Sequence, residues 1–412
     1  MKPEGSRGRR ALAMTVVVAC ALVAGALASA NGEEKANVRE KVLGLDTVIH
    51  IYGIGNMRSA TLISSGDWKG LKARGVVAAG RDGHGMLRMP VEQAAAKRDF
   101  GDNPDPVITI DEFGFDYDGQ IDQRTAVVLR ALKEANPSLH LAVWQMRGPV
   151  APKLAAAYRD VVDLVMMESY VSPENIWLIG AQLKAAELNG LGNRSIIGIG
   201  LGRCPRDHAN WARTKEEVEE QLRFIRLVAP DSPGVAFFGQ PGAHFEKGVP
   251  EVPLTLAETD ELAGRFRQFP ADGAGLRPEL VALAEVFTRR YEKPAIVCSS
   301  RWIQPNFTVG HLGDDGKWTG WGQLAQPTSF HTPLLNLGEE DAKGVTVRVR
   351  NKGEGGEVWG TGKVDIPARS VVVVSMAQHG KREGWRSNWE IEVEAPGCEV
   401  IQFKWTDSLW TE

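Results

Sequence analysis

The sequence predicts a mixed α/β chain, in which a (β/α)8 TIM-like barrel is followed by a small all-β sandwich domain. The length of 412 residues suits one large domain and a smaller one. From residue 47 to about residue 294, short apolar runs of β type alternate with amphipathic stretches, as parallel strands joined by helical crossovers require. Beyond residue 294 the side chains alternate with period two between Gly and Pro turns, which is typical of antiparallel sheets.

Seven strands of the barrel stand out as short runs of apolar, mostly β-branched residues. They occupy residues 48–52, 76–79, 107–110, 139–144, 164–167, 196–199 and 235–238. An eighth strand is expected near residues 60–65. A set of eight favours a closed barrel over the alternative, an open doubly wound sheet.

The helices between these strands are expected where apolar residues recur with helical spacing before a Pro or Gly. The expected helices occupy residues 123–135, 151–161, 175–188 and 215–228. A further helix over residues 278–291 closes the barrel.

The last part of the chain is expected to form the sandwich from strands at residues 344–350, 366–376 and 389–394. Eight of the twelve tryptophans also lie here: Trp302, Trp318, Trp321, Trp359, Trp385, Trp389, Trp405 and Trp410. We expect them to pack in the core and against the barrel. The alternative is a platform on which sugar rings stack, because an indole offers a flat apolar face.

The first thirty residues have the pattern of a secretory signal peptide. Basic residues precede an apolar stretch over residues 11–27, and Ala28-Ser29-Ala30 resembles a cleavage site. Lipidation at Cys20 is the alternative, since Val18-Ala19-Cys20 resembles a lipoprotein box. We therefore expect a signal at 1–30, the barrel at 31–293, the sandwich at 294–412, and a secreted or periplasmic protein.

Composition excludes several classes of partner. Lys and Arg number 48 against 52 Asp and Glu, without the positive excess that nucleic-acid binding requires, so nucleic acid is not an expected partner. No segment after the signal approaches the ~18 apolar residues of a membrane span. Cys204, Cys298 and Cys398 are too few for a disulfide framework. No histidines have the spacing of metal ligands, so we expect neither a metal nor another cofactor. The oligomeric state stays open.

Carboxylates follow two of the predicted strands, at the end where parallel barrels carry their chemistry. Asp111 and Glu112 end the run over 107–110, and Glu168 ends the run over 164–167. Glycoside hydrolysis uses two carboxyl groups, one that protonates the leaving oxygen and one that acts as nucleophile or base. We take Glu112, Glu168 and Asp111 as candidate catalytic residues. The structural alternative is that Glu112 caps a helix or pairs with Arg124, and that Glu168 makes an internal ion pair.

The order of these segments resembles the second half of a TIM-barrel glycoside hydrolase, most closely the chitinase-like, family 18 type. The resemblance covers residues 107–291 and is carried by Ile110-Asp111-Glu112, by Met166-Met167-Glu168 and by the Gly-rich run at 198–202. It implies glycosidase activity and an accessory C-terminal domain. The acid of that family maps onto Glu112, but Ile110 replaces its second acid. The N-acetyl-assisted chemistry of chitinases is therefore not implied, and a direct pair fits better, with Glu112 as acid/base and Glu168 as nucleophile or base.

Further residues near the strand ends are candidates for substrate binding. Tyr52, Trp144 and Tyr170 are suited to stack on sugar rings or to hydrogen-bond them, and His50, Asp116, Gln145 and Gln240 to bind hydroxyl groups. Period two puts His50 and Tyr52 on one face of their strand, which points into the barrel if Ile49 and Ile51 face the helices.

Two functions from different classes follow. The first is a secreted glycoside hydrolase that acts on a poly- or oligosaccharide. The second is a non-catalytic carbohydrate-binding or cell-envelope protein on a barrel scaffold. The sequence does not determine the sugar, the linkage, endo or exo action, or retention or inversion. It also leaves open which of Glu112 and Glu168 is the acid and which the nucleophile or base.

Overall fold

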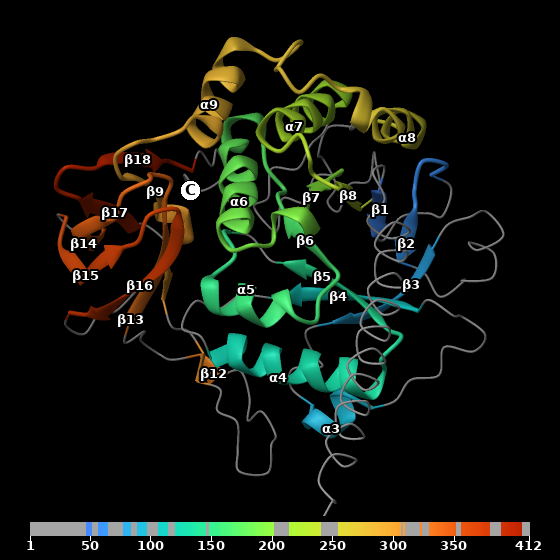
Figure 1. Cartoon of the computed structure of the whole chain (residues 1–412), viewed down its shortest axis with the longest axis horizontal. Coiled ribbons are helices and arrows are strands. Elements are labelled where there is room, and N and C mark those ends of the chain that lie inside the picture. The colour runs from blue at the N-terminus through green and yellow to red at the C-terminus, as the bar shows by residue number, and fades with distance from the viewer. Residues whose placement is uncertain are drawn as a thin grey trace, which may run out of the picture.

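The computed structural model describes a barrel of parallel strands and a separate, mainly antiparallel sheet (Figure 1). The residues that it describes are 47–51, 57–64, 77–83, 89–96, 106–113, 120–145, 148–201, 214–239, 254–305, 308–309, 322–323, 329–351, 356–379 and 389–405. The expected signal at 1–30 lies outside them, as do Cys20, Cys204 and four of the tryptophans named above. No helix of the described chain is long and apolar enough to span a membrane.

Eight parallel strands pair in chain order, and β8 pairs back to β1, so the sheet closes on itself. The strands are β1 Thr47–Ile51, β2 Leu62–Ser64, β3 Val77–Gly83, β4 Val107–Phe113, β5 His140–Gln145, β6 Leu164–Glu168, β7 Ser195–Gly200 and β8 Gly234–Phe238. The mixed α/β class predicted from the sequence is confirmed, and β2 lies where the eighth strand was expected.

The two faces of the strands belong to two different apolar clusters. One cluster fills the interior of the barrel and contains Trp144, Met166 and Ile196. The other lies between the strands and the helices and contains Val143 and Met167, the chain neighbours of Trp144 and Met166. Inward and outward side chains therefore alternate along β5 and β6, as strand geometry requires.

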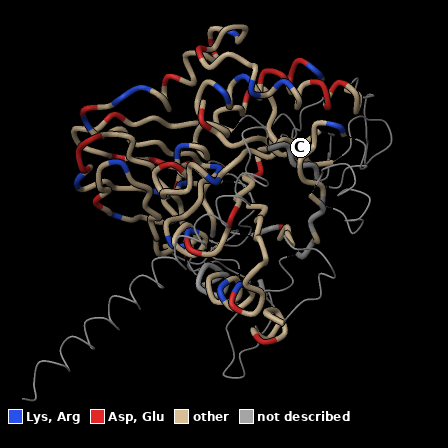
Figure 2. Tube along the Cα trace, turned by 45° about the vertical axis from the view of Figure 1, so that its right-hand side comes forward, with Lys and Arg blue, Asp and Glu red and all other residues tan. Residues whose placement is uncertain are grey.

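Helices cover the outer face of the barrel. They are α3 Val91–Ala94, α4 Gln120–Ala135, α5 Pro152–Arg159, α6 Trp177–Leu188, α7 Lys215–Val228, α8 Leu256–Gly264 and α9 Pro278–Thr288. The bounds of α7 agree with the prediction, whereas α8 was not predicted. Basic and acidic residues are interleaved over the described chain (Figure 2).

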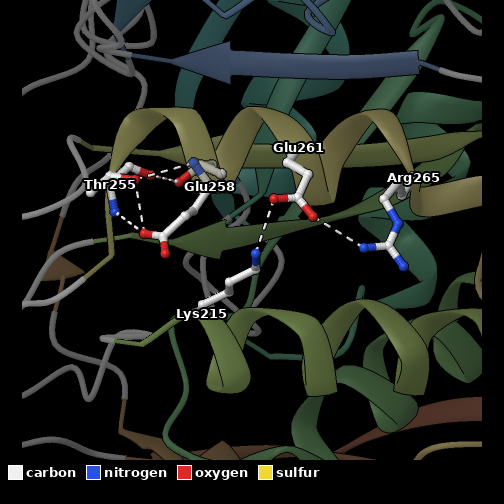
Figure 3. Close-up of polar contacts among 6 residues, drawn as sticks. Lys215, Thr255, Glu258, Glu261 and Arg265 are labelled. Carbon is white, nitrogen blue, oxygen red and sulfur yellow. Dashed lines mark hydrogen bonds and ion pairs between the residues drawn. The ribbon is translucent and has the colours of Figure 1, made fainter.

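Capping boxes define the first turns of α7 and α8. Thr214 and Glu217 form one box, and Thr255 and Glu258 form the other (Figure 3). In each box the threonine hydroxyl accepts from a backbone N–H that has no partner within the helix. Lys215 joins the two helices through Glu261 at 3.0 Å. This pair fixes the N-terminal end of α7 against α8.

The C-terminal part forms one curled sheet instead of the two stacked sheets of the predicted sandwich. The strand order is β17-β14-β15-β16-β13-β9-β18, and β10 also pairs with β13. The strands are β9 Ala295–Ser299, β10 Gln304–Pro305, β13 Ser329–Asn336, β14 Ala342–Asn351, β15 Val358–Ile366, β16 Ser370–Gln378, β17 Trp389–Glu394 and β18 Glu399–Phe403. A small ladder of β11 Thr308–Val309 and β12 Gly322–Gln323 is separate. The ladder is continuous through β13, and the sheet curls until β17 contacts β9.

Most of the predicted strand over residues 366–376 is β16, but its first four residues are the end of β15 and the turn between the two strands. β15 ends at Ile366 and β16 begins at Ser370, with Arg369 at a φ of 51° between them. Left-handed backbone is uncommon for a residue other than Gly. The Arg369 side chain donates to Glu187 of α6 at 2.7 Å, which ties this turn to the barrel helices.

Helix α6 lies between the barrel strands and the C-terminal sheet (Figure 1). The Trp177 ring stacks on Phe403 of β18, with centroids 5.0 Å apart and planes 3° apart. Trp302 and Trp405 contact the same indole at 5.9 and 6.2 Å. These tryptophans pack at the interface, as expected from the sequence.

The other described tryptophans of this part lie in the core of the sheet. Trp359 is buried, and both Trp359 and Trp389 pack against Phe330. Cys298 belongs to the same core and Cys398 packs against it; both are free thiols. Burial raises the pKa of the Cys298 thiol to about 12, so it stays protonated near neutral pH.

Asp163, just before β6, joins three elements at the amino-terminal end of the barrel. Its carboxylate accepts from the backbone N–H of Leu141 at 3.0 Å and faces His140 at 3.5 Å and Lys133 at 3.9 Å. Burial favours the protonated carboxyl, but the contacts with His140, Lys133 and Leu141 outweigh it and lower the pKa of Asp163.

We expect Asp163→Asn to lower the free energy of unfolding by about 1–2 kcal/mol near pH 7. This is below the upper range of ~1.5–3 kcal/mol for hydrogen bonds to charged groups, because solvent screens the partly exposed carboxylate. Because the pKa of Asp163 is lower in the folded chain, this stability is present above the unfolded value of about 3.9 and is lost as the pH falls through the folded pKa. Urea unfolding of both chains between pH 7 and pH 3 measures the difference. The exposed neighbour Asp160 supplies the control, Asp160→Asn, which should change little. A difference that persists unchanged at pH 3 would contradict the assignment.

Candidate functional site

Glu168 ends strand β6 and is buried, with 7% of its surface exposed. It stands in register with Gly198 of β7. The backbone N–H of Ser169 donates to the carbonyl of Gly198 at 2.9 Å, which extends the ladder one residue past the strand. Leu164 and Met166 belong to the interior cluster, so strand alternation directs Glu168 to the same interior face.

The indole of Trp144 crosses the barrel interior from β5 to β7. An ideal Cβ built on Gly198 would lie 2.6 Å from its Cη2 atom, so Gly198 leaves the space that the ring fills. Trp144 has no exposed surface. A side chain without exposed surface cannot stack on a sugar ring, so Trp144 supports the interior beside Glu168, in contrast to its predicted role.

Tyr170 and Phe238 complete an aromatic group around Trp144. The indole Nε1–H of Trp144 donates to the Tyr170 hydroxyl at 2.8 Å. The rings of Tyr170 and Phe238 stack with centroids 5.1 Å apart, and Phe238 lies 5.9 Å from Trp144. Trp144 and Tyr170 are the two predicted site residues of this group. Tyr170 is the more exposed of them, with 5% of its surface accessible.

A bulge in β4 places Asp111 and Glu112 together opposite Trp144. Ile110 pairs with Val143 and Phe113 pairs with Gln145, so two residues of β4 face one residue of β5. β-Bulges of this kind re-aim side chains and are frequent next to active sites. Asp111 is half-buried; of Glu112 the strand position is described, but its side chain lies outside the described residues.

The two carboxylate-bearing strands are separated by β5 alone. Neighbouring strands lie about 4.8 Å apart, so the main chains of β4 and β6 are on the order of 10 Å from each other. Asp111, Glu112 and Glu168 all lie in the last three residues of their strands, at the carboxyl end of the barrel. The structure therefore brings the strand positions of the three predicted acids to one end of the barrel.

Other predicted residues lie elsewhere. The Gln145 side chain lies on the helix side of β5, buried, where its Oε1 accepts from the Tyr158 hydroxyl of α5 at 2.9 Å. This placement supports the strand end and does not present Gln145 to the interior. The strand position of His50 is in register with Ile63 and Phe237, but its side chain lies outside the described residues. Tyr52, Asp116 and Gln240 lie outside the described residues.

Sequence reasoning missed Gly198 and Gln182. A glycine inside a strand often marks a site where another group approaches closely, and that signal was present in the run at 195–200. Gln182 lies in the middle of α6 and is completely buried. Its contacts with the end of β6 span 13 and 14 residues of sequence, and no local pattern reveals them.

Within the described part of the chain, no group of three or more His, Cys, Asp or Glu side chains is arranged to hold a metal ion. A cavity of about 340 Å³ lies between α6, the start of β7 and the loop after α7. Lys184, Asn193 and Asp231 are among its lining residues. None of the predicted site residues lines this cavity.

No protein-family model and no curated protein sequence matches the chain. Several solved structures that resemble it at low similarity are glycoside hydrolases. An endo-β-N-acetylglucosaminidase from Cordyceps militaris is 12% identical, with 55% of this chain and 94% of that chain covered and a TM-score of 0.39. A family 39 glycoside hydrolase from Bacteroides cellulosilyticus WH2 is 14% identical, with 81% of each chain covered and a TM-score of 0.32. A structure described as a glycoside hydrolase is 11% identical over 84% of this chain and 90% of its own, with a TM-score of 0.33.

Proposed function

We propose that this chain is a secreted glycoside hydrolase built on a TIM-like (β/α)8 barrel, and that it cleaves an O-glycosidic bond of a poly- or oligosaccharide. The observation that carries the proposal is the bulge of β4, which sets Asp111 and Glu112 opposite Trp144 of β5. Strand β5 alone separates these two acids from Glu168 of β6. Acids at the ends of two such strands, about 10 Å apart in main chain, are within reach of the ~5–9.5 Å carboxyl separations of glycosidases.

The chemistry divides between two carboxyl groups. In the proposed mechanism Glu112 protonates the glycosidic oxygen as the bond to the anomeric carbon breaks. Glu168 either attacks that carbon directly or removes a proton from the attacking water. On the first route a water molecule, deprotonated by Glu112, then displaces Glu168 from the covalent glycosyl–enzyme, so that two displacements retain the anomeric configuration. The second route is a single displacement and inverts it. Asp111 adds a further carboxylate beside Glu112, and the Tyr170 ring borders the sugar.

Turnover on a panel of aryl glycosides and polysaccharides tests the proposal, with wild type compared to Glu112→Gln. We expect wild type to cleave at least one substrate and the variant to lose about 10²–10⁴-fold in kcat/KM. The loss should be smaller on dinitrophenyl glycosides, because an activated leaving group needs little protonation. Glu134→Gln is the matched control, since Glu134 is an exposed glutamate of α4.

Three outcomes would contradict the proposal. They are absence of cleavage over the whole panel, equal turnover of wild type and Glu112→Gln, and an equal loss in the Glu134→Gln control. Binding of glycans without any cleavage would instead support a non-catalytic carbohydrate-binding protein.

A further inference from the structure

The side-chain amide of Gln182, in α6, forms hydrogen bonds with both Glu168, the last residue of β6, and Ser169, which follows it. Its Nε2–H donates to the Glu168 carbonyl at 2.8 Å, and its Oε1 accepts from the Ser169 hydroxyl. The same Nε2 lies 3.4 Å from the carbonyl of Gly148, in the loop after β5. One buried amide thus joins the end of β6 to the loop that follows the neighbouring strand.

The surroundings leave this amide little freedom. Gln182 and Ser169 have no exposed surface. On one side of α6, Gly180 packs so closely on Phe287 of α9 that a Cβ would lie 2.3 Å from the ring. Trp177 of the same helix stacks on Phe403 of the sheet. The helix that carries Gln182 is therefore fixed by contacts on the side away from β6.

We propose that Gln182 is a positioning residue, which fixes the main chain of Glu168 so that its carboxylate meets the substrate in one geometry. This inference rests on the proposed function of Glu168. Gln182 does not touch the reacting atoms in this arrangement, because its polar atoms bind Glu168 and Ser169 through main chain and hydroxyl. Displacement of a catalytic group by about 1 Å can cost about 100-fold in rate.

Replacement of Gln182 by Met tests the proposal, because Met keeps the length and fills the buried space but removes all three hydrogen bonds of the amide. We expect kcat to fall about 10- to 100-fold while KM stays within about threefold, since substrate contacts remain. Amide exchange followed by mass spectrometry should show faster exchange of Ser169, whose N–H donates to Gly198. Peptides from β5 should be unchanged.

Asn189→Leu provides the matched control. Asn189 follows α6 and is buried, and its side chain donates a hydrogen bond to the carbonyl of Val150 at 2.8 Å. The Asn189→Leu variant therefore loses a buried amide hydrogen bond of the same kind, but one that does not involve Glu168. We expect a similar fall in Tm, but unchanged kcat and unchanged exchange at Ser169. Ser169→Ala should reproduce part of the Gln182→Met effect and be non-additive with it.

The outcomes separate this inference from the proposed function. Unchanged kcat in Gln182→Met, or equal losses of kcat in Gln182→Met and Asn189→Leu, would overturn the positioning role. Unchanged amide exchange at Ser169 in Gln182→Met would show that Gln182 does not fix the end of β6. If the wild-type chain cleaves no substrate, the proposed function fails, and the exchange experiment still decides whether Gln182 fixes this strand end.

Discussion

Glu168→Gln is expected to lower kcat/KM by about 10²–10⁴-fold, the usual contribution of a carboxyl group in general acid–base catalysis. The amide has nearly the same shape as the carboxyl group, so the buried site beside Gly198 should keep its packing. It carries no negative charge and can neither attack an anomeric carbon nor accept a proton from water. Initial rates and urea unfolding of both chains separate lost chemistry from lost fold.

Glu168→Ala with added azide defines the role of the carboxylate. The smaller side chain leaves room for the anion, which can take the place of the missing group. If Glu168 is the nucleophile or the base, azide should restore part of the turnover and give a glycosyl azide of inverted anomeric configuration, because the anion enters in a single displacement. The configuration of the wild-type product then identifies the route: retained for a nucleophile and inverted for a base. Glu187→Gln, which alters a carboxylate of α6 that faces Arg369, should remain fully active. Full activity of Glu168→Gln would remove this residue from the mechanism.

Gly198→Ala is expected to lower the free energy of unfolding by about 1–3 kcal/mol, the usual cost of overpacking a core. The added methyl group would lie 2.6 and 2.8 Å from two ring atoms of Trp144. The indole cannot simply turn aside, because it is fully buried and bonded to Tyr170. Either the ring or strand β7 must move, and both border the candidate site.

A second glycine of the barrel provides the control for this prediction. A Cβ on Gly80 of β3 would meet its nearest neighbour, Ile108, at 3.8 Å, an ordinary contact. Gly80→Ala should therefore cost less than Gly198→Ala in the same urea unfolding assay. Trp144→Phe should relieve the clash, so the double variant with Gly198→Ala should be less destabilised than the sum of the single variants. Additive effects would contradict a clash between these two residues.

Much of the fold follows from local sequence pattern. Helix α7 was predicted with its bounds from the helical spacing of its apolar residues and from Pro230, which follows it. Strand β17 was also predicted with its bounds. Helix α8 was missed although Thr255 and Glu258 have the spacing of a capping box. The turn at 367–369 was included in the predicted strand, because the residue type of Arg369 does not indicate the left-handed backbone that it adopts.

The candidate site was harder to predict than the strands. The carboxylates were expected just after strands ending at residues 110 and 167, whereas β4 runs on to Phe113 and β6 includes Glu168. The outward face of Gln145 was not predicted either. A shift of one residue in strand register moves each side chain to the other face, and neither the register of His50 nor the bulge at Asp111 is encoded in a local pattern. Gln182 acts across elements, so only the packed structure reveals it.

The apolar cluster on the outer side of the barrel strands extends into the C-terminal sheet. Val297, Leu335 and Val371 of the sheet belong to the same apolar cluster as the residues beneath α6 and α9. If the chain were cut after Lys293, the apolar surface of these helices would be exposed to water. The apolar face of the released sheet would be exposed as well. The C-terminal part is therefore not a detachable module, because it covers apolar surface of the barrel helices, and truncation after Lys293 should yield aggregates instead of a smaller folded protein.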